Sequence, residues 1–123
     1  MTNGEETGQR FDLSERTAVF GENVIRFVRT EKEDFVSRPV ISQLVRSSTS
    51  IGANYGEADE SGTRKEFRYR ISLCKREAKE TEHWLRMFAA ACPVEAERAR
   101  EFWKEAHELV LIFSSIYRNT KEE

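Results

Sequence analysis

The stretch FRYRISLCKREAKETEHWLRMF, residues 67–88, decides the fold of this chain. Its apolar and small side chains recur at alternating spacings of four and three over three heptads, at Phe67, Ile71, Cys74, Ala78, Thr81, Leu85 and Phe88. Such a repeat predicts one long helix that packs at a shallow angle within a helical bundle. Thr63 and Glu66 fit a capping box at its start, and Cys92-Pro93 predicts its end.

Three further helices are expected around this one. The first should begin at Ser14, a suitable N-cap, after a flexible N-terminal tail of residues 1–12. The second is expected over about residues 37–61, and the last over about residues 94–119. Because the connections are short, consecutive helices should run antiparallel. The sequence therefore predicts an all-α, up-down-up-down four-helix bundle over residues 13–120.

Composition limits the function classes. The chain has 123 residues and a net charge of −2, which suits one domain and argues against a strongly cationic nucleic-acid binder, although a local basic face remains open. The longest purely aliphatic or aromatic run, Leu109 to Phe113, is far too short to span a membrane. The N-terminus lacks the pattern of a signal peptide, and Cys74 and Cys92 lack metal-ligand spacing. We therefore expect a cytoplasmic protein with reduced thiols.

The second helix carries an unusual ridge of small residues. Ser48, Gly52 and Gly56 lie four apart and therefore share one side of the helix. A glycine inside a helix costs about 0.5–1 kcal/mol relative to alanine. Two of them predict that another helix approaches this ridge closely.

The last helix carries two apolar seams. The first comprises Ala99, Phe102, Ala106, Leu109, Phe113 and Ile116. The second recurs at intervals of seven and comprises Ala96, Trp103, Val110 and Tyr117. The second seam either widens the face that packs on the core or meets another subunit.

No motif in the sequence predicts an enzyme, a cofactor or a metal centre. Glu80 and His83 have the Glu-x-x-His spacing of di-iron bundles, but such sites need a second copy of the motif. The other histidine, His107, has Lys104 three positions before it, so no second copy exists. A nucleophile elbow and a glycine-rich phosphate loop are also missing from the sequence.

Two polar sets are candidate sites. The third helix carries a basic face that could follow a phosphate backbone or could be a solvated, ion-paired surface, formed by Arg68, Lys75, Lys79 and Arg86. A second set could form a partly buried structural network between the second and third helices, formed by Arg46, Asn54, Glu77 and Glu80.

Residues 41–58, ISQLVRSSTSIGANYGEA, resemble the signature helix of the 23S rRNA intervening-sequence protein family. Residues 13–25 and 75–85 are also similar to this family. The resemblance implies a four-helix bundle that assembles as a homopentamer around a central channel, and it implies no settled biochemical role. A similar fold serves as the basic, pentameric accessory protein of diversity-generating retroelements, which engages a reverse transcriptase and nucleic acid. The acidic balance of this chain departs from that accessory protein.

Two functional hypotheses follow. The first is a non-catalytic, oligomeric scaffold that binds another protein. The alternative is an accessory factor that binds RNA or DNA through the basic face of the third helix. Because phosphate contacts release counterions, a strong loss of nucleic-acid affinity with added salt would favour the alternative.

Overall fold

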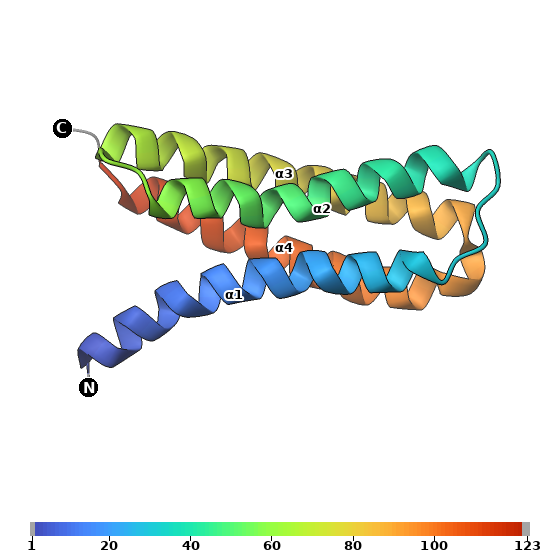
Figure 1. Ribbon diagram of the computed structural model, residues 1–123, viewed down its shortest axis with the longest axis horizontal. Helices are drawn as coiled ribbons and strands as arrows, with labels where there is room; N and C mark the ends of the chain where they lie inside the picture. Colours follow the sequence, from blue (N-terminus) through green and yellow to red (C-terminus); the bar gives the residue numbers. More distant parts are fainter. Residues whose placement is uncertain (1, 122–123) are drawn as a thin grey trace.

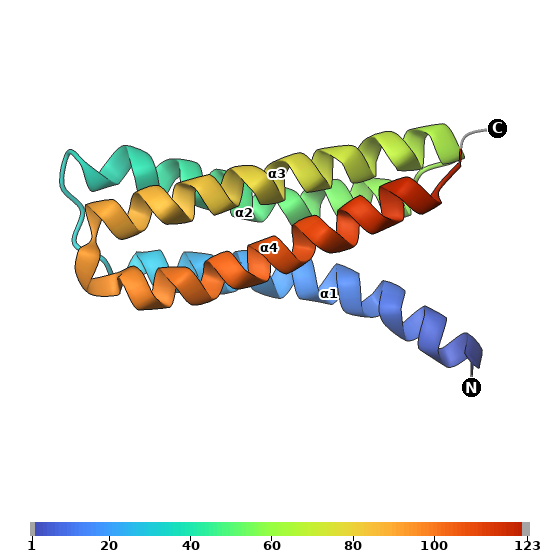
Figure 2. The ribbon, with the colours of Figure 1, turned by 180° about the vertical axis from the view of Figure 1, so that it is seen from behind.

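The computed structural model describes residues 2–121, with side chains from residue 13 onward. Four long helices follow one another: α1 (Thr2–Arg29), α2 (Ser37–Asp59), α3 (Arg64–Ala91) and α4 (Ala96–Asn119). A short 3-10 turn, η1 (Pro93–Glu95), connects the last two. Each helix runs opposite to the one before it (Figure 1), and the view from behind shows the same order (Figure 2). The prediction of an all-α, up-down-up-down bundle is confirmed.

The beginning of α1 differs from the prediction. The helix starts at Thr2 and not at Ser14, so residues expected in a tail have helical backbone. Proline does not occur before residue 39, and Gly4 and Gly8 each cost only about 1 kcal/mol in a helix. The first turns of α1 diverge from the other helices (Figures 1 and 2), so helix propagation, and not packing, extends the element. The flexibility of this segment stays a prediction.

The core follows the heptads of α3. Six of the seven predicted positions are buried, and Phe67 alone is half-buried. Three fully buried phenylalanines, Phe27, Phe88 and Phe113, come from three different helices. Phe27 meets Phe88 edge-on at 5.2 Å between ring centroids and stacks on Phe102 at 4.8 Å. The period that predicted the helix therefore also determined which of its faces is buried.

Helices α1 and α2 approach each other closely. A Cβ atom on Gly52 would lie 3.4 Å from Thr17 Oγ1, and one on Gly21 would lie 3.4 Å from the Cα of Thr49. Ser48 is fully buried. Two of the three ridge residues thus lie in the close interface that the glycines predicted.

The third ridge residue does not lie in that interface. Gly56 is exposed, and a Cβ atom built on it meets nothing within 4 Å among the described residues. A step of four residues turns a helix by about 400°, so the row rotates by about 40° at each step. Over the two steps from Ser48 the ridge leaves the α1 interface, and the prediction for Gly56 is wrong.

The second seam of α4 widens the core face. Val110 is buried, and Ala96, Trp103 and Tyr117 are half-buried on the side of α4 that meets α3. The Tyr117 ring lies under the guanidinium of Arg68 from α3, 3.8 Å from its carbon to the ring centroid. The seam therefore has an intramolecular neighbour, and a subunit contact through the exposed parts of Trp103 and Tyr117 stays a prediction.

An aspartate organises the turn between α1 and α2. The Asp34 carboxylate accepts hydrogen bonds from the backbone N–H groups of Ser37 (2.7 Å) and Val36 (2.9 Å), and Ser37 Oγ accepts one from the Asp34 N–H (3.0 Å). These donors, the Ser37 N–H foremost, lower the pKa of Asp34. The charged carboxylate thus caps the start of α2.

The α1–α2 interface predicts a steric difference between two glycines. Gly52→Leu should lower the free energy of unfolding by about 1–3 kcal/mol, because the new side chain would enter space held by Thr17. Gly52→Ala should be tolerated, since its Cβ makes an ordinary contact. Gly56→Leu is the matched control and should leave stability unchanged or slightly raised. Chemical denaturation measures all three, and a Gly52→Leu variant as stable as the parent contradicts the close interface.

The Asp34 cap predicts a pH-dependent contribution to stability. The pKa of Asp34 is lower in the folded chain than its unfolded value of about 3.9, so the stabilisation is complete well above that pH. It should be lost as the pH falls through the folded pKa. Asp34→Ala should therefore lower the melting temperature at neutral pH, and the difference should shrink under acid. Glu33→Ala is the control, and an equal effect of both variants would exclude the cap.

Candidate functional site: the α3–α4 face

The predicted basic residues of α3 border α4. Arg68 and Glu82 lie fourteen positions apart on α3, and both contact α4: the Arg68 Nε donates to the Tyr117 carbonyl (3.3 Å), and Glu82 Oε2 lies 3.1 Å from His107 Nδ1. Lys75 lies midway between them in the sequence and therefore on the same stripe. Lys79 lies four residues after Lys75, and Arg86 lies four residues after Glu82, so both are next to the stripe on the helix surface. The four predicted cations thus share the side of α3 that faces α4.

Arg68 differs from the other three. Its guanidinium stacks on the Tyr117 ring and donates to the Tyr117 carbonyl, so it secures the end of α4. Arg68 therefore has a structural role in the bundle, and its contact with nucleic acid stays a prediction. Lys79 and Arg86 are exposed and Lys75 is half-exposed, so these three can meet a ligand.

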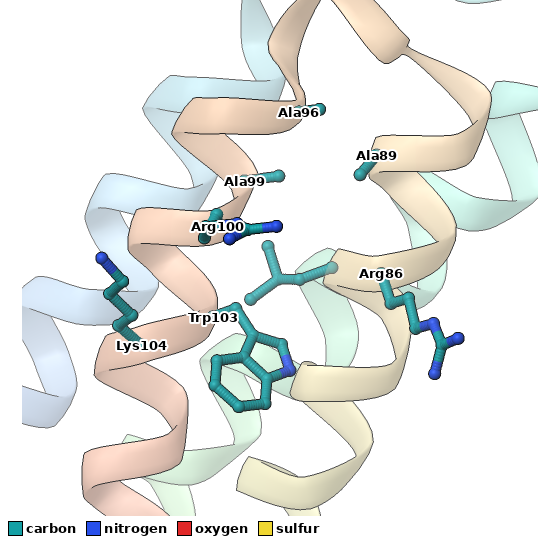
Figure 3. A pocket seen from close by; sticks show the side chains of 8 residues that line it. Arg86, Ala89, Ala96, Ala99, Arg100, Trp103 and Lys104 are labelled. Atoms are coloured by element: carbon teal, nitrogen blue, oxygen red, sulfur yellow. The ribbon is translucent and has the colours of Figure 1, made fainter.

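Helix α4 adds two cations that the sequence analysis missed, Arg100 and Lys104. Both are exposed and, with Arg86, line a pocket of about 480 Å³ between α3 and α4 (Figure 3). Leucine and alanine form the rest of its lining together with the indole of Trp103; these residues are Leu85, Ala89, Ala96 and Ala99. No carboxylate is among the lining residues. The four-residue spacing of Arg100 and Lys104 could have indicated that they share one side of α4. The acids Glu97 and Glu101 lie before and between them in the sequence, so the segment shows no excess of positive charge.

Two further contacts shape this face. The Trp103 ring is stacked on the His107 ring, with 4.9 Å between centroids and 8° between planes. His107 in turn meets Glu82, the acid that lies among the cations of α3. Glu82 is thereby engaged by α4, and Trp103 is held in place on one side.

Two of the acids of α4 bind α1 and not α3. Arg16 on α1 donates to both carboxylate oxygens of Glu105, from Nε at 2.7 Å and from Nη2 at 2.8 Å. Its Nη2 also reaches a carboxylate oxygen of Glu108 at 3.4 Å. These bonds and the nearby charges raise the pKa of Arg16. Two of the acids of α4 are therefore engaged by α1, away from the α3–α4 pocket, whose lining holds three cations and no carboxylate.

The predicted polar network forms without one of its members. Arg46 on α2 binds both Glu77, at 3.3 Å, and Glu80 on α3. Trp84 Nε1 also donates to Glu80, at 3.2 Å. Asn54 instead donates to the Ser50 carbonyl (2.9 Å) of its own helix. It lies eight residues from Arg46, about 12 Å along the axis, so it is too far along α2 to reach the same acids.

The arrangement offers little for metal or thiol chemistry. Glu80 turns to Arg46 on α2, whereas His83 is exposed beside Trp84. Across residues 13–121, no three His, Cys, Asp or Glu side chains converge as metal ligands would. Burial raises the pKa of the Cys74 thiol to about 12, and burial with nearby acids raises that of Cys92, so neither favours a reactive thiolate. The absence of a metal and of enzymatic activity stays a prediction.

A small bundle of four helices, with a cation-lined pocket between α3 and α4, is the class of protein that these features define. The chain belongs to the 23S rRNA-intervening sequence protein family, whose model matches residues 9–115. This confirms the family that the α2 sequence resembled.

A crystal structure at 1.70 Å resolution supports the same assignment. It is of a protein with unknown function from the S23 ribosomal protein family of Bacteroides thetaiotaomicron VPI-5482. The two chains are 30% identical with a TM-score of 0.74, and the match covers 88% of this chain and 97% of the other. No curated protein matches this sequence. Within the part of the chain that the structure describes, no helix is long and apolar enough to cross a membrane.

The Arg46 network predicts a measurable coupling between α2 and α3. A double-mutant cycle of Arg46→Ala and Glu77→Ala should give a coupling free energy of about 0.5 kcal/mol, since Arg46 is 44% exposed and water weakens the pair. The same cycle with Asn54→Ala in place of Arg46→Ala should give none. Equal couplings in the two cycles, measured by urea denaturation, would contradict the observed network.

Proposed function

We propose that the protein is a non-catalytic, cytoplasmic accessory factor that binds nucleic acid on the α3–α4 face. The observation that carries the proposal is the segregation of charge. Three accessible cations of α3 (Lys75, Lys79 and Arg86) and two of α4 (Arg100 and Lys104) lie on the α3–α4 side. Two α4 acids bind α1 on another side. The net charge of −2 is therefore a poor guide to the potential that a ligand meets on this face.

The geometry of the cations suits a phosphate backbone. They are distributed along two antiparallel helices and not gathered at one point, so a chain of phosphates can meet several of them in succession. If all five contact phosphates, the logarithm of affinity should fall against the logarithm of salt with a slope of about −3 to −5. A protein ligand bound through apolar contacts would show a much weaker dependence.

Charge reversal tests the face directly. Lys79→Glu combined with Arg86→Glu should weaken binding of an RNA oligonucleotide at least tenfold at low salt, because two phosphate contacts become repulsive. Arg26→Glu combined with Arg29→Glu on α1 is the matched control. It changes the net charge equally, at exposed positions of α1, a helix that supplies none of the five cations.

Fluorescence anisotropy measures the affinity, and circular dichroism checks that both variants fold. An equal loss in the two variants would mean that only net charge matters. Absence of binding by the parent protein at low salt would overturn the proposed function.

An oligomeric, protein-binding scaffold is the second candidate. Phe35 is 86% exposed, Val36 53% and Val94 96%. Phe35 and Val36 lie in the α1–α2 connection and Val94 in η1, and both connections are at the same end of the bundle (Figures 1 and 2). Apolar side chains gathered at one exposed end favour a partner surface there.

The family resemblance gives the scaffold a specific expectation, a homopentamer. Light scattering coupled to size exclusion should then give five times the chain mass of 14.3 kDa. Phe35→Ser combined with Val94→Ser should leave the fold intact, since both side chains are exposed, and would show whether this end takes part in assembly. A mass of one chain at micromolar concentration contradicts the oligomer.

A further inference from the structure

The α3–α4 pocket differs chemically from the rest of the basic face. Lys75 and Lys79 offer only charge, whereas the pocket adds an apolar lining and an indole between its cations. Three of its lining residues are alanines, Ala89, Ala96 and Ala99. These short side chains leave a hollow of about 480 Å³, within the range of small-ligand pockets.

We propose that this pocket receives an unpaired nucleobase of a single-stranded nucleic acid. The base stacks against Trp103, and the flanking phosphates meet Arg86, Arg100 and Lys104. The inference rests on the nucleic-acid function proposed above and narrows it to single strands. A base in a duplex is already stacked and paired, so it reaches such a pocket only after it is extruded.

The charges of the pocket match this ligand. Arg100 extends from α4 toward α3 across the pocket, while Arg86 and Lys104 extend to the outside (Figure 3). Lys104 has only a weak exposed partner, Glu101 at 3.5 Å. No carboxylate lines the pocket, so no residue of its lining repels a phosphate. The cations would hold a phosphate in any nucleic acid, so preference for a single strand must come from the indole and its apolar surroundings.

The indole is prepared for this contact. Trp103 is half-buried, its ring is stacked on His107, and His107 meets Glu82. A ring already held in one orientation loses little freedom when a base stacks on it, and stacking on an aromatic side chain accepts any of the bases. The site therefore selects an unpaired strand without selecting a sequence.

Tryptophan fluorescence reports on the pocket itself. The chain has two tryptophans, and Trp84 lies on the other side of α3, bonded to Glu80. In a Trp84→Phe background, Trp103 is the only source of indole emission. An oligouridylate and an oligothymidylate should both quench this emission, whereas an RNA duplex of equal length and free uridine monophosphate should quench it weakly or not at all.

Affinity variants separate stacking from charge. In the same background, Trp103→Ala should weaken single-strand binding by about tenfold and leave duplex binding unchanged, because it removes one stacked base. Trp103→Phe should retain most of the single-strand affinity, because phenylalanine can also stack on a base. Such a result would exclude misfolding as the cause of the weaker binding of Trp103→Ala. The parent protein, which retains both tryptophans, provides the control for the Trp84→Phe background.

The outcomes distinguish this inference from the function on which it rests. One outcome would overturn the base pocket and keep the proposed function. In it, single and double strands bind equally, charge reversal abolishes the binding, and Trp103→Ala leaves it unchanged. Uridine monophosphate bound as tightly as the oligonucleotide would make the pocket a nucleotide site and overturn its role with strands. Absence of binding to every nucleic acid at low salt overturns both.

Discussion

The bundle depends on the small residues on either side of Ile51 in α2, at positions 47–50 and 52. On one side of α2, Ser48 and Gly52 allow the backbone of α1 to approach, where Gly21 and Thr17 oppose them. On the other side, the buried Thr81 hydroxyl of α3 donates to Ser47 Oγ at 3.0 Å. Bulky side chains here would separate both neighbours at once, because a packed interior has no spare volume to receive them.

Helices α1 and α4 are held apart by large side chains, in contrast to the close approach of α1 and α2. Between α1 and α4 the spacing is maintained by aromatic rings, with Phe102 stacked on Phe27 at 4.8 Å and tilted against Phe20 at 6.3 Å. Arg16 bridges the same gap to Glu105. The rotation of α4 that places Phe102 in the core and Glu105 beside α1 also turns Arg100 toward α3, across the α3–α4 pocket. Core packing thus determines which charges face which neighbour.

This coupling explains how an acidic protein can bring several cations together around one pocket. Acids and bases alternate along α4, so their number says little about their placement. Residues three or four apart share a side of the helix, and the aromatic seam determines which side meets α1. In an oligomer such a pocket would be repeated, and several weak contacts with one polyanion would then act together. In such an oligomer, each chain would need only a modest affinity for the polyanion for the whole complex to bind it tightly.

The sequence alone predicted the four helices, their antiparallel order, the buried face of α3, and the family. The first three follow from local chemistry: the spacing of apolar residues determines a helix and its buried face, and short connections force consecutive helices to reverse. The family was indicated by the resemblance of residues 41–58. The sequence also predicted that Arg46 meets Glu77 and Glu80 across α2 and α3.

The tertiary structure decided which polar and small side chains meet. Arg68 stacks on Tyr117, Asn54 bonds within its own helix, Gly56 leaves the α1 interface, and Arg100 joins Arg86 at one pocket. Each outcome depends on how far one helix is rotated about its axis and shifted along its neighbour. Spacing within a helix leaves both quantities open, because they are set by how side chains from different helices fill a shared interior.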